Sequence, residues 1–217
     1  MKVGTDGVLL GAWVALGDTD RRLLDVGTGT GVIALMLAQR VPAARITALD
    51  IDAACVRQAR ANADRSPWGG RVATCCTPVQ EYRSEEPFDL VVSNPPYYDR
   101  SLLPPDAGRT TARHTVALTH GELIAAACRL LTPAGRLAVI LPAAESQRFC
   151  AQAHGRLALL RLTEVWSTPR SGVKRCLMEF VRGDAAALRT DRLVIEQAPG
   201  RFTEEYRRLT GDFYLKF

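Results

Sequence analysis

Length, composition and charge narrow the classes of protein to which this sequence can belong. The 217 residues are 47% hydrophobic, enough to bury one substantial core, and we expect a single domain over residues 1–217. The formal net charge of +5, with a pI near 9.1, permits a polyanionic partner. No run of 18 apolar residues and no signal-peptide pattern occur, so neither membrane insertion nor export is indicated, and we expect a cytoplasmic protein.

Apolar periodicity alternates between strand and helix patterns along the chain. Strand patterns occupy residues 23–26, 45–50, 71–76, 88–92, 135–141, 157–166 and 174–182, and helical patterns occupy residues 30–40, 52–64, 121–132 and 144–154. This alternation predicts an α/β fold with a doubly wound, seven-stranded, mostly parallel sheet. The last two strands are joined without a clear helix, which predicts an antiparallel C-terminal edge hairpin. A short strand near 191–196 would extend that edge or pair locally.

The first motif precedes a helical pattern near the N-terminus. Thr5, Asp6 and Gly7 stand before an apolar run that begins at Val8. This order predicts a helix start at which Thr5 or Asp6 satisfies the free amide groups of the first turn.

The second motif is a glycine turn between a strand and a helix. It runs Asp25-Val26-Gly27-Thr28-Gly29-Thr30-Gly31, a GxGxG spacing instead of the GxGxxG that binds pyrophosphate. Glycines Gly27, Gly29 and Gly31 let the backbone approach a ligand closely, and Asp25 favours a cationic ligand without phosphate. Asp50 ends the next strand, about 20 residues on, where an acid accepts from ribose hydroxyls. A nucleoside with a cationic part is the predicted ligand.

The third motif, Asn94-Pro95-Pro96-Tyr97, follows a buried strand and lies where open α/β sheets bind ligands. Prolines fix φ and remove amide donors, so the carbonyl of Pro95 and the side-chain oxygen of Asn94 can accept both hydrogens of a planar amino group, and Tyr97 can stack on it. Taken alone, the tetrapeptide is equally typical of a stiff turn that ends a buried strand. The preceding glycine motif shifts the interpretation toward S-adenosylmethionine and N-methylation.

At this point the chain resembles the bacterial tRNA1(Val) (adenine(37)-N6)-methyltransferase family. The resemblance spans essentially the whole chain and is carried by Lys2 to Trp13, Asp25 to Gly31, Asn94 to Tyr97, Ala112 to His114 and Asp212 to Phe217. It implies a Rossmann-like class I methyltransferase fold that uses S-adenosylmethionine, with Thr5 and Asp6 near the methionine part of the cofactor. Many related enzymes place an acid after the third strand to bind the cofactor adenine, whereas here residues 75–80 contain none.

The expected reaction is direct transfer of a methyl group to the N6 atom of an extruded adenine in tRNA. Asn94 and Pro95 accept the N6 hydrogens, Pro96 stiffens the turn and Tyr97 stacks on the base. The rate depends on alignment of the amino group with the methyl donor, because the amino proton can leave after the methyl group arrives. No strong base is needed.

Basic residues after this motif are candidate RNA contacts. Arg109, Arg113 and His114 follow the amine clamp, and Lys174 and Arg175, beside Arg170, could extend a basic track across the end of the sheet. Each of these charges taken singly is more typical of solvated surface than of an RNA contact. We expect tRNA as the partner and no obligate protein partner.

Cysteine and histidine lack the spacing of a metal site. The six cysteines form no CxxC pair and the three histidines form no HxxxH pattern, so we predict no bound metal and interpret the cysteines as small buried hydrophobic residues.

Three alternative functions remain open from the sequence. A glutamine N5-methyltransferase that acts on release factors would use the same clamp for an amide. A nicotinamide-dependent oxidoreductase is disfavoured by GxGxG and Asp25. A noncatalytic RNA-binding module with this fold would have no use for Asn94.

Overall fold

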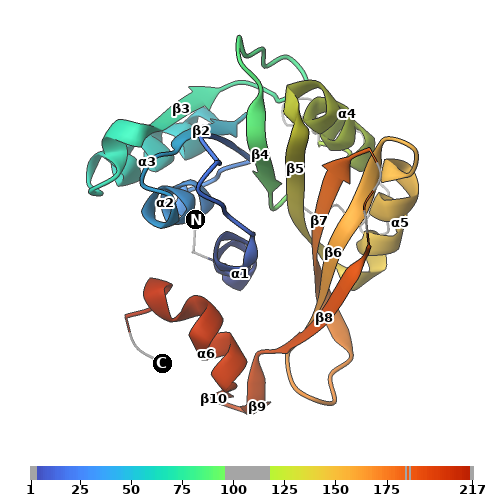
Figure 1. Ribbon diagram of the computed structural model, residues 1–217. Coiled ribbons are helices and arrows are strands. Elements are labelled where there is room, and N and C mark those ends of the chain that lie inside the picture. Colours follow the sequence, from blue (N-terminus) through green and yellow to red (C-terminus); the bar gives the residue numbers. More distant parts are fainter. Residues whose placement is uncertain (1–3, 96–117, 184, 186, 216–217) are drawn as a thin grey trace, which may run out of the picture.

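The computed structural model describes residues 4–95, 118–183, 185 and 187–215 (Figure 1). In chain order the elements are α1 (Thr5–Trp13), β1 (Arg22–Val26), α2 (Val32–Arg40), β2 (Arg45–Asp50), α3 (Ala53–Asp64), η1 (Gly69–Arg71), β3 (Val72–Cys76), β4 (Phe88–Ser93), α4 (His120–Leu130), β5 (Leu131–Pro142), α5 (Ala143–Ala153), β6 (Leu157–Trp166), β7 (Val173–Arg182), β8 (Arg189–Val194), β9 (Glu196–Ala198), β10 (Arg201–Phe202), α6 (Glu204–Thr210) and η3 (Gly211–Phe213). Each helix and strand expected from periodicity is present.

The main sheet has the strand order β3-β2-β1-β4-β5-β7-β6-β8. Neighbours are parallel except at β7, which runs antiparallel to both β5 and β6. The α/β fold, the mostly parallel sheet and the antiparallel β6–β7 hairpin are therefore confirmed. The sheet has eight strands and not the expected seven, because β8 pairs in parallel with β6. Pairing with β8 covers the edge of β6, whose amide and carbonyl groups would otherwise lack partners.

The bounds of β5 differ most from expectation. The capping box of Thr119 and Glu122 starts α4, and the helix ends at Leu130. The next residue already pairs with Phe88 of β4, so the segment before Gly135 is strand. A Cβ at position 135 would lie 3.0 Å from the Phe88 carbonyl oxygen, which explains glycine at this irregular part of the ladder.

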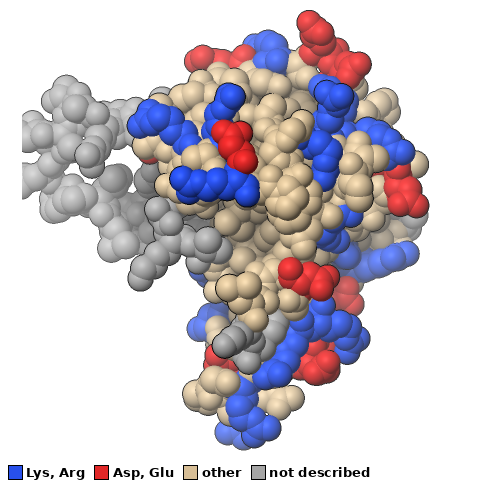
Figure 2. Space-filling model, turned by 90° about the vertical axis from the view of Figure 1, so that its left-hand side faces the viewer, with Lys and Arg blue, Asp and Glu red and all other residues tan. Residues whose placement is uncertain are grey.

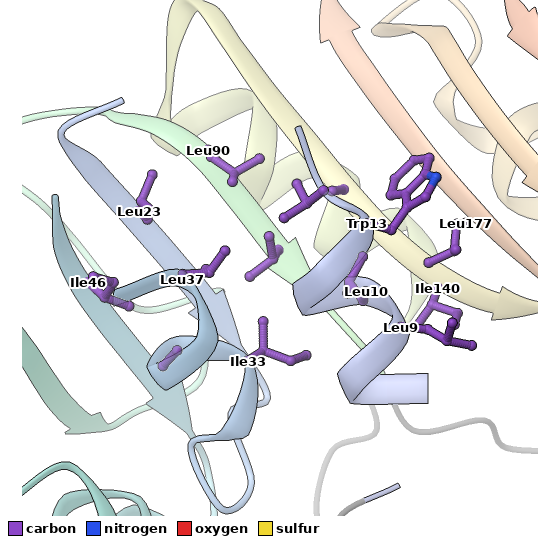
Figure 3. Close-up of a cluster of buried hydrophobic side chains, with 14 of the residues drawn as sticks. Leu9, Leu10, Trp13, Leu23, Ile33, Leu37, Ile46, Leu90, Ile140 and Leu177 are labelled. Carbon is purple, nitrogen blue, oxygen red and sulfur yellow. The ribbon is translucent and has the colours of Figure 1, made fainter. Parts of the chain in front are cut away.

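Helices cover both faces of the sheet, and strand residues alternate between two hydrophobic clusters. Leu23 and Leu90 pack in the cluster that contains α1 and α2 (Figure 3), whereas the adjacent Leu24 and Val91 pack in the cluster that contains α4 and α5. Burial of each leucine stabilises the fold by about 1.5–3 kcal/mol. This period-2 alternation holds the strand ends, and the loops that follow them, in a fixed register.

The C-terminal segment packs on the helices of one face. α6 lies beside α1 (Figure 1). Leu209, Phe213 and Tyr214 contact a small cluster of Val8, Ala12 and Met36, which belong to α1 and α2. In the described part of the chain, no helix is long and apolar enough to cross a membrane.

Candidate active site at the carboxyl edge of the sheet

The carboxyl ends of β1, β2 and β4 meet at one edge of the sheet. Val26, near the start of the glycine loop, is aligned with Leu49 of β2 and with Ser93 of β4. The glycine loop, Asp50 and Asn94 are therefore brought to the same edge. Because β7 is antiparallel, its first residues also lie there, and Arg175 is aligned with Pro142 at the end of β5.

The glycine loop has the left-handed backbone that the spacing predicted. Gly27, Gly29 and Gly31 have φ values of 73°, 55° and 83°. At Gly31 a Cβ would also lie 3.2 Å from the Cα of Ala59 in α3, so a side chain would push this helix away. At Gly27 a Cβ would face open space, which leaves the loop accessible to a ligand on that side.

Asp25 is fully buried beneath this loop. Its Oδ2 accepts hydrogen bonds from the Thr28 hydroxyl (2.6 Å) and the Ala34 amide (3.2 Å), while its Oδ1 has no hydrogen-bond partner among the described residues. Burial raises the pKa of Asp25 to about 7, and the charge of Asp50 adds to the rise, although the two hydrogen bonds oppose it. A cation near this loop would favour the ionised form, so the site fits the cationic cofactor expected from the sequence.

Asp50 shapes the same loop from the end of β2. Its Oδ2 accepts from the Gly29 amide at 2.8 Å, and its Oδ1 accepts from the Asp52 amide at 3.0 Å, at the start of α3. Each carboxylate oxygen can accept a second hydrogen bond, so these contacts leave capacity for a ribose hydroxyl. Next to it, the Thr77 amide donates to the Asp50 carbonyl, which closes the loop after β3 against β2.

Asn94 and Pro95 lie directly after β4. The hydroxyl of the buried Ser93 donates to the Val26 carbonyl at 2.9 Å and so ties the end of β4 to the start of the glycine loop. Asn94 is half-buried and Pro95 is buried. Sequence reasoning missed Ser93, although a hydroxyl residue at the end of an apolar strand is a signal for such a link. The predicted clamp residues Pro96 and Tyr97 lie outside the described residues.

The N-terminal motif differs from expectation. α1 begins at Thr5, its cap residue is Gly4, and no side chain caps the first turn, so the predicted capping role of Thr5 or Asp6 is wrong. The Asp6 carboxylate instead accepts a hydrogen bond from Arg175 Nε at 2.8 Å. Thr5 is exposed and Asp6 is half-buried. A predicted cofactor residue and a predicted RNA contact thus form an ion pair with each other.

The predicted RNA contacts are only partly described. Lys174 and Arg170 are exposed at the carboxyl edge, whereas Arg109, Arg113 and His114 lie outside the described residues. On the face shown in Figure 2, basic side chains form several groups that are separated by uncharged surface and acidic groups. Charge alone therefore does not mark an RNA-binding surface on this face.

A hollow lies at the opposite, amino edge of the sheet and is thus remote from the glycine loop. Its volume is about 510 Å³, and it lies beside Asp20, Asp89 and Arg136. Among the described residues, no group of three or more His, Cys, Asp or Glu side chains is placed to hold a metal ion.

Comparison with known proteins agrees with this geometry. The family model described as "Methyltransferase small domain" matches residues 7–157. A tRNA1(Val) (adenine(37)-N6)-methyltransferase from Flavobacterium johnsoniae is 43% identical over 219 residues, which cover 100% of this chain and 93% of the relative. Proteins of the same name from Porphyromonas gingivalis and Aeromonas hydrophila are 45% and 43% identical, and the alignments cover 89% and 91% of those relatives and at least 99% of this chain.

Solved structures share the fold at lower sequence identity. A predicted O-methyltransferase from Agrobacterium tumefaciens has a TM-score of 0.77 at 22% identity, covering 95% of this chain and 96% of its own. A glycopeptide N-methyltransferase solved with S-adenosylmethionine has a TM-score of 0.59 at 14% identity, covering 82% and 95%. The fold is that of class I methyltransferases. The protein is an S-adenosylmethionine-dependent methyltransferase, and its chain belongs to the tRNA1(Val) (adenine(37)-N6)-methyltransferase family.

Proposed function

We propose that this enzyme methylates the N6 atom of an adenine in tRNA, and that its target is adenine 37 of tRNA1(Val). The observation that carries the proposal is the placement of Asn94 and Pro95 beside the glycine loop, fixed by the hydrogen bond from Ser93 to Val26. The names of relatives that are 43–45% identical to this chain support the choice of substrate.

Residues at the carboxyl edge would hold the cofactor. Asp25, Gly27, Gly29 and Gly31 form the loop that a ligand can approach closely, and Asp50 offers acceptor capacity for ribose hydroxyls. Thr5 and Asp6, in the first turn of α1, would lie near its methionine part. When bound, S-adenosylmethionine supplies a methyl group on a positively charged sulfur, which makes that carbon open to attack by a neutral nitrogen.

The clamp residues orient the target amino group. The side-chain oxygen of Asn94 and the carbonyl of Pro95 accept the two N6 hydrogens and so turn the nitrogen lone pair toward the cofactor side of the site. The rigid ring of Pro96 would keep this turn in one conformation, and Tyr97 would stack on the extruded base. The acceptors require no shifted pKa, because the amino nitrogen becomes acidic only after it is methylated.

RNA would approach over the carboxyl edge. Lys174 and Arg170 are exposed there, next to the end of β6, and Arg109, Arg113 and His114 would add phosphate contacts around the splayed base. The positive charge of these residues is modest and dispersed, which favours weak, salt-dependent attraction of RNA. Recognition of the base then depends on the clamp residues. We further propose that residues 1–217 act as one domain in the cytoplasm, without an obligate protein partner.

The test is transfer of a labelled methyl group from S-adenosylmethionine into total tRNA from cells that lack the protein, followed by nucleoside analysis. We expect label as N6-methyladenosine, and an unmodified tRNA1(Val) transcript with guanosine at position 37 should accept none. Asn94→Ala should lose turnover and still bind S-adenosylhomocysteine.

Two outcomes would contradict the proposal. Label in a release factor and none in tRNA would mean that the clamp serves a glutamine amide. Binding of tRNA without any transfer would instead identify a noncatalytic module.

A further inference from the structure

The ion pair between Asp6 and Arg175 joins segments that are far apart in the sequence. The two residues are separated by 169 positions, and Nε of Arg175 lies 2.8 Å from Oδ2 of Asp6. The side chains are 34% exposed at Arg175 and 23% exposed at Asp6. The pair thus connects the first turn of α1 to the first residues of β7 at the carboxyl edge.

The first turn of α1 lies against the start of α2, the helix that follows the glycine loop. A Cβ at Gly7 would lie 3.8 Å from Cγ1 of Ile33 and 4.0 Å from Cγ1 of Val32, which form the first turn of α2. α2 begins directly after Gly31, the last glycine of the loop. A shift at the start of α1 is therefore transmitted to the residues that follow the loop.

The opposite end of α1 is held in a different way. Arg161 donates to the Trp13 carbonyl at 2.8 Å and stacks on its ring, and the Trp13 indole donates to the buried Thr163 at 2.9 Å. Arg136 donates to the Ala15 carbonyl at 2.8 Å, just beyond the helix. Several part-buried or buried contacts thus fix the C-terminal end of α1.

We propose that Arg175 is a positioning residue for cofactor binding, which acts through Asp6 by holding the first turn of α1 against the start of α2. This inference deepens the proposed function and rests on it only for the identity of the cofactor. It gives Arg175 a role different from a direct phosphate contact. Because both side chains are partly exposed to solvent, the pair contributes little to folding, and we expect its loss to change the site and leave the fold intact.

The experiment compares Asp6→Asn, Arg175→Gln and the double variant with a matched control, Glu86→Gln. The control breaks the ion pair between Arg22 and Glu86, which lies at the amino edge of the sheet. It is matched to the Asp6–Arg175 pair in its distance of 2.9 Å and in the 33% exposure of its arginine. For each intact variant we would measure the melting temperature without ligand, the Kd for S-adenosylhomocysteine by calorimetry, and the KM for tRNA.

We expect Arg175→Gln to weaken S-adenosylhomocysteine binding by about two- to fivefold, the effect of one lost, partly exposed ion pair. The double variant should bind as Asp6→Asn alone does, since Arg175 acts through Asp6. Arg175→Lys, which keeps the charge, should recover most of the affinity. Melting temperatures of these variants and of the control should change by no more than about 2 °C.

Three results would overturn the inference. One is an unchanged Kd for S-adenosylhomocysteine in Arg175→Gln with a raised KM for tRNA, which would make Arg175 a direct RNA contact. Another is full additivity of the two substitutions in Kd. The third is a fall in melting temperature large enough to account for the loss of affinity, which would mean that the pair has a structural role only. If the unsubstituted protein transfers no methyl group to tRNA, the substrate proposal fails, while the Kd comparison still decides the role of Arg175.

Discussion

Among the described residues, two of the buried carboxylates, Asp25 and Glu179, lie in opposite electrostatic settings. Glu179, 2% exposed on β7, lies between two guanidinium groups, with one oxygen 3.6 Å from Arg136 and the other 3.6 Å from Arg161. Asp25, 0% exposed at β1, has no ion pair among the described residues and accepts hydrogen bonds from uncharged groups only. The charge of Glu179 is compensated within the chain, whereas that of Asp25 is not.

The difference separates a charge that stabilises the fold from one that we propose serves cofactor binding. Glu179 and its arginines join β5, β6 and β7 to the C-terminal end of α1, through Arg161 and Trp13. Asp25 lies at the carboxyl edge, where burial without a cation destabilises its ionised form. A buried acid without a counter-charge is typical of a binding site, because a bound cation offsets the unfavourable free energy of ionising that acid.

The largest expected effect is on the stability that Glu179 provides. Glu179→Gln leaves Arg161 without its buried anion, while Arg136 keeps its 2.7 Å pair with Asp20, so we expect the free energy of unfolding to fall by about 3 kcal/mol. Urea unfolding measures it. Glu145→Gln is the control, because its pair with Arg148 is at the surface, where the arginine is 73% exposed. Equal losses in the two variants would show that burial does not make the Glu179 network important.

Asp25 should make the stability of the fold depend on pH. The pKa of Asp25 is raised to about 7 in the fold, from 3.8 in the unfolded chain. Its contribution is thus fully present below about pH 4 and lost as the pH rises to about 7, by a few kcal/mol in all. Without cofactor, the protein should lose stability relative to Asp25→Asn between pH 5 and pH 8. Urea unfolding of both proteins at each pH measures this difference, and parallel curves would contradict the raised pKa.

Cofactor affinity should depend on the charge of Asp25. At pH 8 the ionised Asp25 favours a cationic ligand, and Asp25→Asn should weaken binding of S-adenosylmethionine by about tenfold. The effect should shrink at pH 5.5, where Asp25 is itself protonated. Calorimetry at the two pH values checks this. An effect that is equal at both values would mean that the variant acts through shape and not through charge.

The smallest expected effect concerns the hydroxyl of Thr28. Its hydrogen bond to Asp25 lowers the pKa of that carboxyl, against the rise caused by burial. Thr28→Val should cost about 1 kcal/mol at pH 8 and less at pH 5, since a protonated carboxyl depends less on this donor. Its thermal unfolding, followed at both pH values, tests the prediction. Thr30→Val, a substitution in the same loop, is the matched control.

Some features were predictable because they depend on neighbours in the sequence. The period-2 strands, the βα alternation and the glycine spacing indicated a mostly parallel sheet, and placed Asp25 and Asp50 near the ends of their strands and Asn94 after the end of another. Parallel strands then bring such positions to one edge, which the register of β1 with β2 and β4 confirms. The role of each residue toward cofactor or RNA stays a prediction.

Other features could not be predicted, because they depend on which distant segments meet. Periodicity left open whether the strand near 191–196 extends the sheet edge or pairs locally, and only the structure shows that it pairs with β6. The sequence indicated a helix cap at Asp6 and an RNA contact at Arg175, and only packing of α1 on the sheet shows that the two side chains lie 2.8 Å apart. The sequence by itself determined the fold class and the loop chemistry, since these follow from local backbone preferences and hydrophobic period, and its motifs carried the resemblance to the family. Tertiary structure alone decided which buried charges are compensated, because that depends on distances between side chains that the chain brings together only when it folds.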